Sequence, residues 1–443
     1  MQAIVAGQRG DVPGLMALAQ QALTFDLADS GEPGSLSLLA LGNAHFFNGD
    51  LAAAYQTLTQ VIAPREVTGD LFATMLAIYI LADVEMHQGQ LLQAAELLQQ
   101  GKQLGTGPDG QPLPIAGLAH MALGDVLRER NELDAAMHNL RTGIALARQW
   151  GIHVMLVDST IALARLKQAC GDGDGALQVI RDFEVQMHQA WVTPWHRAQL
   201  AACRARLWLV QGQRALASQW AQDYAARLEA DAPNLRPLVK YAFAHTTLAR
   251  VRLTEGQVEE AVQLLTRLLA VAEAGGWMGD VIEILALQAL AMQAQGASTQ
   301  ALTTLGRALA LAEPEGYVRI FVDEGAPMAA LLAQSAERRA QSDSLLIYIE
   351  HLLRAFPEPQ RQAQIVLRSP LERSSALIEP LSERELEVLR LLAAGLESPE
   401  IARELIISVS TARTHIKNIY GKLGVHGRVQ AIERARALGL VRP

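Results

Sequence analysis

A short turn that recurs every 39 to 44 residues constrains the fold of this chain more than any other feature. From the second turn onward, each one is preceded by a small residue seven positions earlier. An alanine follows five positions later, and an apolar residue follows nine positions later. The turns begin at Gly10, Gly49, Gly89, Asn131, Gly171, Gly212, Gly256 and Gly296.

This spacing predicts antiparallel helical hairpins. Gly or Asn accepts the left-handed backbone that ends a helix, and small residues on facing turns let two helices approach closely. A single hairpin cannot cover its own apolar faces, so neighbouring hairpins must stack. Half of the residues are hydrophobic, which supplies enough apolar surface for such a stack. We therefore expect an all-α fold in which residues 1–315 form a solenoid.

The pattern of a small residue, six residues, Gly, four residues and Ala resembles the tetratricopeptide repeat. Gly42, Gly49 and Ala54 carry it in one unit, for example. The period here exceeds the usual 34 residues, and we expect the surplus in longer connections between hairpins. The first unit departs from the pattern, because Gly10 is followed by Leu15 rather than alanine. The chain thus begins inside a hairpin, and we expect further residues upstream of Met1.

The pattern stops near residue 315, and three further segments follow. Residues 316–356 form a connecting segment that includes a helix-like stretch. Residues 357–380 contain prolines at 357, 359, 370 and 380, and we expect a flexible linker there. Residues 381–443 then form a small domain of their own.

The net charge of −8 hides an uneven distribution. Residues 381–443 hold 10 Lys/Arg and 7 Asp/Glu, a net of +3, so the preceding residues carry −11. An acidic body joined to a basic tail indicates two functions. We hypothesise that the body covers the tail when no signal is bound.

The tail reads as four short helices with a helix-turn-helix at its centre. Ser382 and Glu385 form a capping box for the first helix, and Ser398 before Pro399 predicts the cap of the second. Ile406 and Ile407 make the turn, and Ser408 or Ser410 caps the third helix. We expect Ile401, Ala402 and Leu405 to pack on Val409, Ile416 and Ile419. The outward face of the third helix then suits the major groove of DNA.

The tail also resembles the LuxR-type (GerE/NarL-like) DNA-binding domain. The matching strings are Leu381-Ser-Glu-Arg-Glu385, Glu400-Ile-Ala402, Ile407-Ser-Val-Ser-Thr411, His415, Asn418-Ile419 and Lys422-Leu-Gly424. The resemblance implies base reading by Arg413, Thr414 and Lys417. It implies backbone contacts by Ser408, Ser410, Thr411, Asn418 and Lys422. It also implies a dimer on DNA through the face of Val429, Ile432, Ala435 and Arg436.

Solenoid, linker and LuxR-type domain in this order resemble the MalT-like large ATP-dependent regulators. In that family a nucleotide-binding module precedes the solenoid. This sequence has no G-x-x-x-x-G-K-[ST] motif, so ATP dependence is not carried over. No catalytic constellation, metal-ligand spacing or cofactor motif is visible, so we expect no enzyme activity, no cofactor and no metal. Trp191 and Trp195 could stack on a ligand, but packing between repeats is the favoured interpretation.

These features predict a cytoplasmic transcriptional regulator that binds double-stranded DNA. Two distant cysteines fit a reducing compartment, and no signal peptide or membrane span is visible. We expect the solenoid to sense a small-molecule inducer or a protein, and we expect RNA polymerase as a further partner. The alternative is a tetratricopeptide-type interaction scaffold whose DNA-binding tail is non-functional.

Overall fold

The computed structural model describes two compact units, Met1–Pro357 and Glu358–Pro443. Within the first unit it describes residues 11–62, 70–150, 156–187, 193–230, 241–338 and 344–357. Within the second it describes residues 381–423 and, beyond them, residues 425, 428, 431, 432 and 435. The expected linker, residues 357–380, lies outside the described residues except for Pro357. The described ordered elements are helices, in agreement with the all-α prediction.

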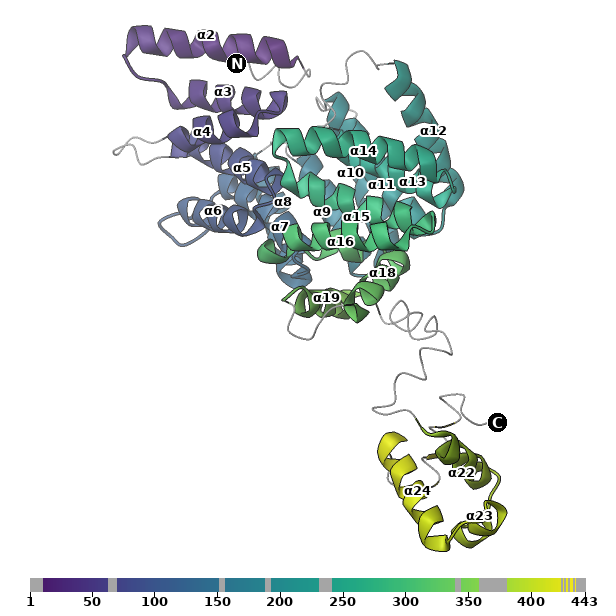
Figure 1. Ribbon diagram of the computed structural model, residues 1–443. Helices are drawn as coiled ribbons and strands as arrows, with labels where there is room; N and C mark the ends of the chain where they lie inside the picture. Colours follow the sequence, from purple (N-terminus) through teal and green to yellow (C-terminus); the bar gives the residue numbers. More distant parts are fainter. Residues whose placement is uncertain are drawn as a thin grey trace. The chain divides into compact units, whose positions relative to one another are not determined.

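Helical hairpins stack along the first unit in the order of the sequence (Figure 1). The first helix of each hairpin after α2 has an odd number and the second an even number. The helices are α2 (Val12–Asp29), α3 (Ser35–Asn48), α4 (Leu51–Ile62), α5 (Leu71–His87), α6 (Leu91–Leu104), α7 (Gly117–Glu129), α8 (Leu133–Trp150), α9 (Leu156–Ala169), α10 (Gly173–Met187), α11 (Pro194–Val210), α12 (Arg214–Ala230), α13 (Ala242–Thr254), α14 (Val258–Gly275), α15 (Met278–Ala294) and α16 (Ser298–Ala312).

The repeat positions behave as the spacing predicts. The seven turn residues from Gly49 to Gly296 all have positive φ, including Asn131 at 65°. The alanines five residues after these turns are all fully buried. The small residue before a turn faces the apolar residue after it: a Cβ on Gly124 would lie 2.6 Å from Leu140 Cγ. Close approach of the two helices is therefore the reason for the small residue.

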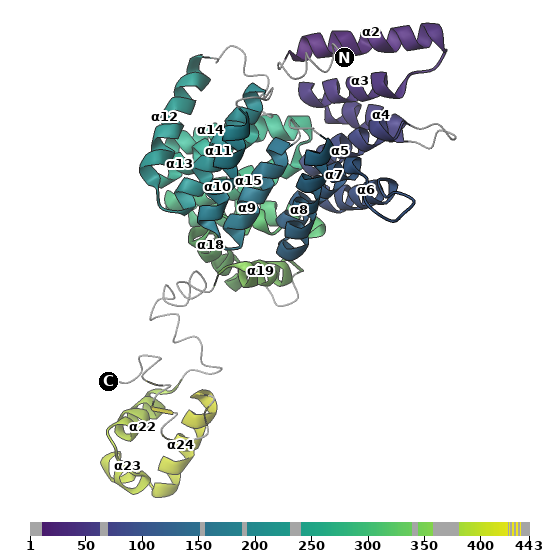
Figure 2. The same cartoon turned by 180° about the vertical axis from the view of Figure 1, so that it is seen from behind.

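The first helices of the hairpins make a closed ring. Contacts run from α5 to α7, α9, α11, α13 and α15 in turn, and α15 contacts α5 again. We call these six helices the inner ring. Figure 2 shows the same stack from the opposite side. The superhelix thus completes a turn and closes on itself, which the sequence pattern did not predict.

Contacts between residues far apart in the sequence form the seam of this ring. His87 Nδ1 at the end of α5 lies 3.0 Å from Asp280 Oδ2 at the start of α15. The His87 ring also lies 5.9 Å from the ring of Trp277. Outside this seam, the ring of Trp195 on α11 lies 5.0 Å from that of Phe47 on α3. Trp195 is nearly buried, so the packing interpretation of this residue is confirmed, whereas Trp191 lies outside the described residues.

The seam ion pair predicts a pH-dependent stability. Burial alone would lower the pKa of His87, but the carboxylates of Asp280 and Asp83 outweigh it and raise that pKa to about 9. Because the folded pKa exceeds the ordinary 6.5, this stabilisation is complete below pH 6.5 and is lost as the pH rises through 9. We expect the thermal unfolding midpoint of the wild-type chain to fall between pH 6.5 and 9, and to fall less in His87→Gln.

The exposed residue His138 provides the matched control. His138→Gln should keep the pH dependence of the wild type, as followed by circular dichroism at fixed ionic strength. Equal slopes for the wild type and His87→Gln would show that the seam does not depend on this proton.

A segment that follows the last hairpin enters the ring. We call residues 313–325 the strap; it contains the helical turns η3 (Glu313–Glu315) and α17 (Arg319–Val322). The Val318 N–H donates to Glu129 O of α7 at 3.0 Å. Helices α18 (Ala326–Glu337) and α19 (Ser344–Ala355) follow the strap and pack on each other. The first unit therefore extends to Pro357 and includes the segment that we expected to be a connection.

Candidate functional site

The second unit has a hydrophobic core of its own. Helices α22 (Glu383–Ala393), α23 (Ser398–Glu404) and α24 (Val409–Leu423) contact one another. The fully buried residues of this core are Val388, Leu389, Leu392, Ile401, Ala402, Ala412, Ile419, Ala431 and Ala435. Because the core draws on all three helices, it fixes which face of α24 remains exposed.

The structure confirms the predicted cap of α22 but not that of α23. Ser382 and Glu385 form the predicted capping box of α22. The cap of α23 is Glu397, one residue before the predicted Ser398, so that prediction was wrong. Glu397 N–H donates to the Glu400 carboxylate at 2.7 Å, and this reciprocal box sets the helix start one residue earlier.

Hydroxyl groups gather where α24 begins. Ser408 accepts a hydrogen bond from Thr411 N–H at 3.1 Å, so Ser408 rather than Ser410 caps the helix. Its hydroxyl also lies 2.7 Å from the hydroxyl oxygens of both Ser410 and Thr411. All three side chains are exposed, so they are accessible to a phosphate group.

The exposed face of α24 carries the predicted base-reading residues. Arg413, Thr414, Lys417 and Asn418 are exposed, whereas Ala412 and Ile419 lie in the core. Among the described residues, no carboxylate lies within ion-pair distance of Arg413 or Lys417. Two cationic groups therefore remain available to an external anion.

Other basic groups of this unit are occupied within it. Lys422 Nζ lies 2.9 Å from Glu385 Oε2, which joins the end of α24 to the start of α22. Arg428 pairs with Glu397 at 2.5 Å and donates to Leu392 O at 3.1 Å. Lys422, expected on the DNA backbone, thus has a structural partner that Arg413 and Lys417 lack.

The structure differs from the predicted packing of Val409 and describes only part of the predicted dimer face. Val409 was expected to pack on α23, but its side chain is 38% exposed because the helix begins there and turns it outward. Of the expected dimer residues, Ala435 is buried in the core of the same unit and Ile432 is partly exposed. Val429 and Arg436 lie outside the described residues.

The turn between α23 and α24 contains a strained residue. Ile406 has φ 53° and is 93% exposed. A left-handed backbone costs an L-residue about 1–2 kcal/mol, and β-branched residues tolerate it poorly. We expect Ile406→Gly to raise the unfolding midpoint of residues 381–443 by several degrees, since about 1 kcal/mol shifts a small domain by roughly 4–8 °C.

Arg390→Gly, on the exposed side of α22, serves as the control for this prediction. Its backbone is helical, so glycine there should cost about 1 kcal/mol of stability and thereby lower the midpoint. A lower midpoint for Ile406→Gly, measured by calorimetry, would mean that the isoleucine makes a stabilising contact.

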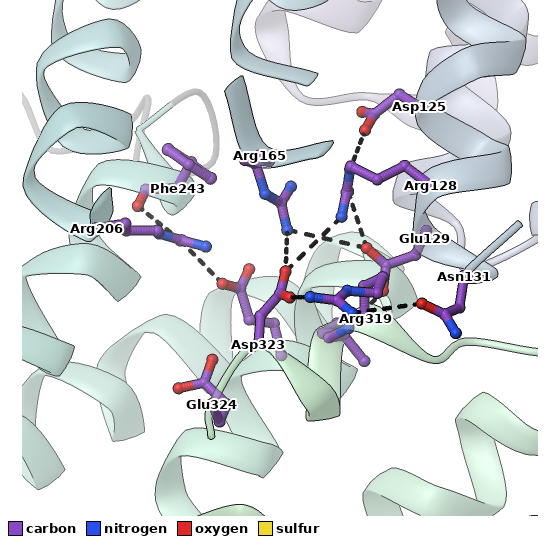
Figure 3. A network of polar contacts seen from close by, with 12 residues as sticks. Asp125, Arg128, Glu129, Asn131, Arg165, Arg206, Phe243, Arg319, Asp323 and Glu324 are labelled. Atoms are coloured by element: carbon purple, nitrogen blue, oxygen red, sulfur yellow. Dashed lines mark hydrogen bonds and ion pairs between the residues drawn. The ribbon is translucent and has the colours of Figure 1, made fainter. Parts of the chain in front are cut away.

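The solenoid holds a second cluster of functional groups, which the sequence analysis missed. Charged side chains point into the inner ring and meet those of the strap (Figure 3). The signal was in the sequence: the residue six positions before each turn is Asp83, Asp125, Arg165, Arg206 and Arg250 in five successive hairpins. Charged residues at the same repeat position in consecutive units indicate that the inner face of the solenoid is not purely apolar.

The contacts of this cluster are dense. Arg128 donates to Asp125 at 2.7 Å and to Glu129 at 3.0 Å. Arg206 and Arg250 share the carboxylate of Glu283, at 2.9 Å and 2.7 Å. Burial would raise the pKa of Glu283, but these two arginines lower that pKa to about 2. Glu283 is therefore ionised at neutral pH.

The two units define a class of protein. Residues 379–435 match the family described as bacterial regulatory proteins of the luxR family, so the second unit is a LuxR-type helix-turn-helix domain. Residues 1–338 match the MalT-like TPR region. This match covers more than half of the sequence, so the chain belongs to the MalT-like family of tetratricopeptide-repeat proteins.

Curated relatives align with most of this chain. The HTH-type transcriptional regulator MalT of Serratia proteamaculans is 26% identical over 450 residues, which cover 99% of this chain and 49% of the relative. The MalT regulator of Yersinia enterocolitica is 24% identical over 411 residues, covering 90% of this chain and 44% of the relative. The chain thus spans about half the length of these relatives.

A solved structure shares the fold of the solenoid. The crystal structure of a Rap protein complexed with Competence and Sporulation Factor superposes with a TM-score of 0.53. It is 14% identical and covers 82% of this chain and 97% of the other. At this identity the similarity concerns the fold alone. No helix among the described residues is long and apolar enough to cross a membrane.

Proposed function

We propose that the chain acts as a sequence-specific DNA-binding transcriptional regulator. The observation that carries this proposal is the exposed face of α24, where Arg413 and Lys417 have no carboxylate partner among the described residues. Arginine and lysine on such a helix can reach guanine edges in the major groove, and Thr414 between them can contact either base edges or thymine methyls.

Hydroxyls and backbone amides at the start of α24 support the same proposal. Ser408, Ser410 and Thr411 present three hydroxyl groups at a helix N-terminus, which favours a DNA phosphate. Asn418 extends the exposed face by one turn, and Lys422 reaches the backbone only when it leaves Glu385. Binding as a dimer would present two such helices to two half-sites.

We infer that the solenoid senses a small-molecule inducer or a protein. We also infer that the chain controls transcription through contact with RNA polymerase. The repeat stack supports a sensing role because solenoids present extended inner surfaces to ligands. No ATP-dependent step is placed on these residues, because they include no phosphate-cradling loop motif. A cytoplasmic location fits a protein that must reach DNA.

The test is selection of bound sequences from random duplex DNA, with residues 381–443 and with the full chain. The small unit has its own core, so it can be tested alone. We expect one enriched motif, and an affinity that falls steeply between 50 and 200 mM salt as counterions are released. Weaker binding by the full chain at low salt would support covering of the tail by the acidic body.

The alternative function gives the opposite result. A scaffold with a non-functional tail would enrich no motif, and its weak affinity would be the same for any duplex. Partner capture through residues 1–315 would then remain as the only activity.

A further inference from the structure

Arg165 stands out within the charged interior of the solenoid. Its guanidinium lies 3.7 Å from Asp323 Oδ2 and 3.9 Å from Glu129 Oε2, both beyond hydrogen-bonding distance. Its side chain is 21% exposed, and that of Asp323 is 31% exposed. Arg165 is therefore a cation with loosely held partners that solvent can reach. Figure 3 shows it between the side chains of Arg206 and Arg128.

Arg128, beside Arg165, has a buried hydrogen-bond donor without an acceptor in the part of the chain that the structure describes. Arg128 is only 2% exposed, yet its Nη1 atom has no hydrogen-bond partner among the described residues. A buried donor without an acceptor is costly, so an acceptor at this place would be bound favourably. Burial and, after it, the guanidinium group of Arg250 lower the pKa of Arg206 to about 9, although Glu283 acts in the opposite direction.

An aromatic wall completes this region. The guanidinium of Arg206 lies 3.7 Å above the ring centroid of Phe243, and that of Arg165 lies 5.7 Å from it. Two cations beside one ring hold an apolar surface next to a donor-rich surface. That combination suits a ligand with an acidic group on a carbon skeleton.

The strap supplies part of the acidic groups that these arginines contact. The ring helices contribute four arginines (Arg128, Arg165, Arg206, Arg250) and three carboxylates (Asp125, Glu129, Glu283). To these contacts the strap adds one arginine and two carboxylates, Arg319 with Asp323 and Glu324. Among these contacting groups, the ring helices thus supply one more arginine than carboxylates, and the strap supplies one more carboxylate than arginines.

We propose that Arg165, with Arg128 and Arg206 beside it, binds the carboxylate or phosphate group of a small organic anion. The anion takes the position that Asp323 holds beside Arg165, and its carbon skeleton lies against Phe243. This proposal gives the chemical class of the inducer, and it rests on the sensing role in the proposed function.

Binding at this site has a consequence for the rest of the unit. Asp323 belongs to the strap, which leads directly into α18 and α19. Tyr348 of α19 donates a hydrogen bond to Tyr317 O of the strap. When the anion displaces Asp323, it weakens the contacts that hold the strap in the ring. The helices nearest to the linker therefore respond to the ligand.

The test uses isothermal titration calorimetry on the full chain, in a low-salt buffer without phosphate or sulfate. Citrate is the carboxylate probe, glycerol 3-phosphate is the phosphate probe, and glucose is the neutral comparison. We expect at least one anion to bind with a Kd below about 1 mM, and glucose not to bind. A charged hydrogen bond contributes roughly 10- to 100-fold in affinity, so Arg165→Gln should weaken binding at least tenfold.

Two variants separate this proposal from a general effect of charge. Asp323→Asn removes the competing carboxylate and should tighten binding severalfold, opposite in sign to Arg165→Gln. Arg307→Gln removes an exposed arginine that pairs with Glu273 on the outer helices, and it should leave binding unchanged. Weaker binding by Asp323→Asn, equal loss in Arg307→Gln, or no binding of either anion would overturn the proposal.

The DNA selection described above distinguishes the two failures. If the isolated 381–443 unit enriches a motif but neither anion binds, the proposed function holds and the ligand class is wrong. If no motif is enriched and the anion still binds through Arg165, the site holds and the regulatory function fails.

Discussion

Arg128→Ala is expected to destabilise the solenoid by about 3–5 kcal/mol, the usual cost of removing one partner of a buried ion pair. Arg128 is almost fully buried, and its charge offsets Asp125, Glu129 and the strap residue Asp323. Without it, these carboxylates lose their buried counter-charge. At about 2.1 cal/mol/K of unfolding entropy per residue, a unit of 357 residues shifts by roughly 1.3 °C per kcal/mol, so the unfolding midpoint should fall by about 4–7 °C.

The control is Arg307→Ala, which removes an exposed pair with Glu273 and should cost less than about 1 kcal/mol. The double variant Arg128→Ala/Glu129→Gln should regain part of the loss, because one of the unpaired charges is then removed. Calorimetry of the full chain measures all of these changes. A midpoint for Arg128→Ala equal to that of the wild type would contradict the structural role of the cluster.

Arg413→Ala is expected to weaken binding to the selected DNA site by about 1–3 kcal/mol, or roughly 5- to 150-fold. Arg413 is exposed on α24 and has no carboxylate partner among the described residues, so its guanidinium is available to a guanine edge. The loss should be large for the selected sequence and small for unrelated duplexes, because a base contact carries the specificity.

Lys417→Ala tests the second cation of the same face and should also lower affinity. If Lys417 contacts a phosphate rather than a base, the loss will be similar for all sequences and the salt slope will fall by about 1. Arg390→Ala removes the same charge from α22 and is the matched control. Fluorescence anisotropy with selected and scrambled duplexes measures each variant. Equal losses for Arg390→Ala and Arg413→Ala would argue against readout by α24.

The repeat positions could be read from the sequence because each hairpin depends on local spacing. Gly124 and Leu140 meet within one hairpin, so two residues 16 positions apart decide their contact. The closure of the ring depends on curvature that accumulates over six helices, and no short spacing encodes it. The contact of His87 with Asp280 therefore could not be predicted.

In the helix-turn-helix, too, some features could be predicted from the sequence and others could not. The capping box at Ser382 and the exposed face with Arg413 followed from sequence spacing. The start of α23 did not, because Ser398 before Pro399 is a common cap pattern, whereas the structure forms a box of Glu397 and Glu400 instead. The left-handed Ile406 could not be expected either, because a β-branched residue disfavours that backbone.

Closure of the inner ring also sets an order of events during synthesis of the chain. The two sides of the seam, His87 and Asp280, are 193 residues apart. At about 5–20 residues per second, a ribosome needs roughly 10–40 s to make the stretch between them. During that time the earlier hairpins can fold on their neighbours, but α5 has no α15 to meet. Nascent chains therefore hold an open stack until α15 has left the ribosome.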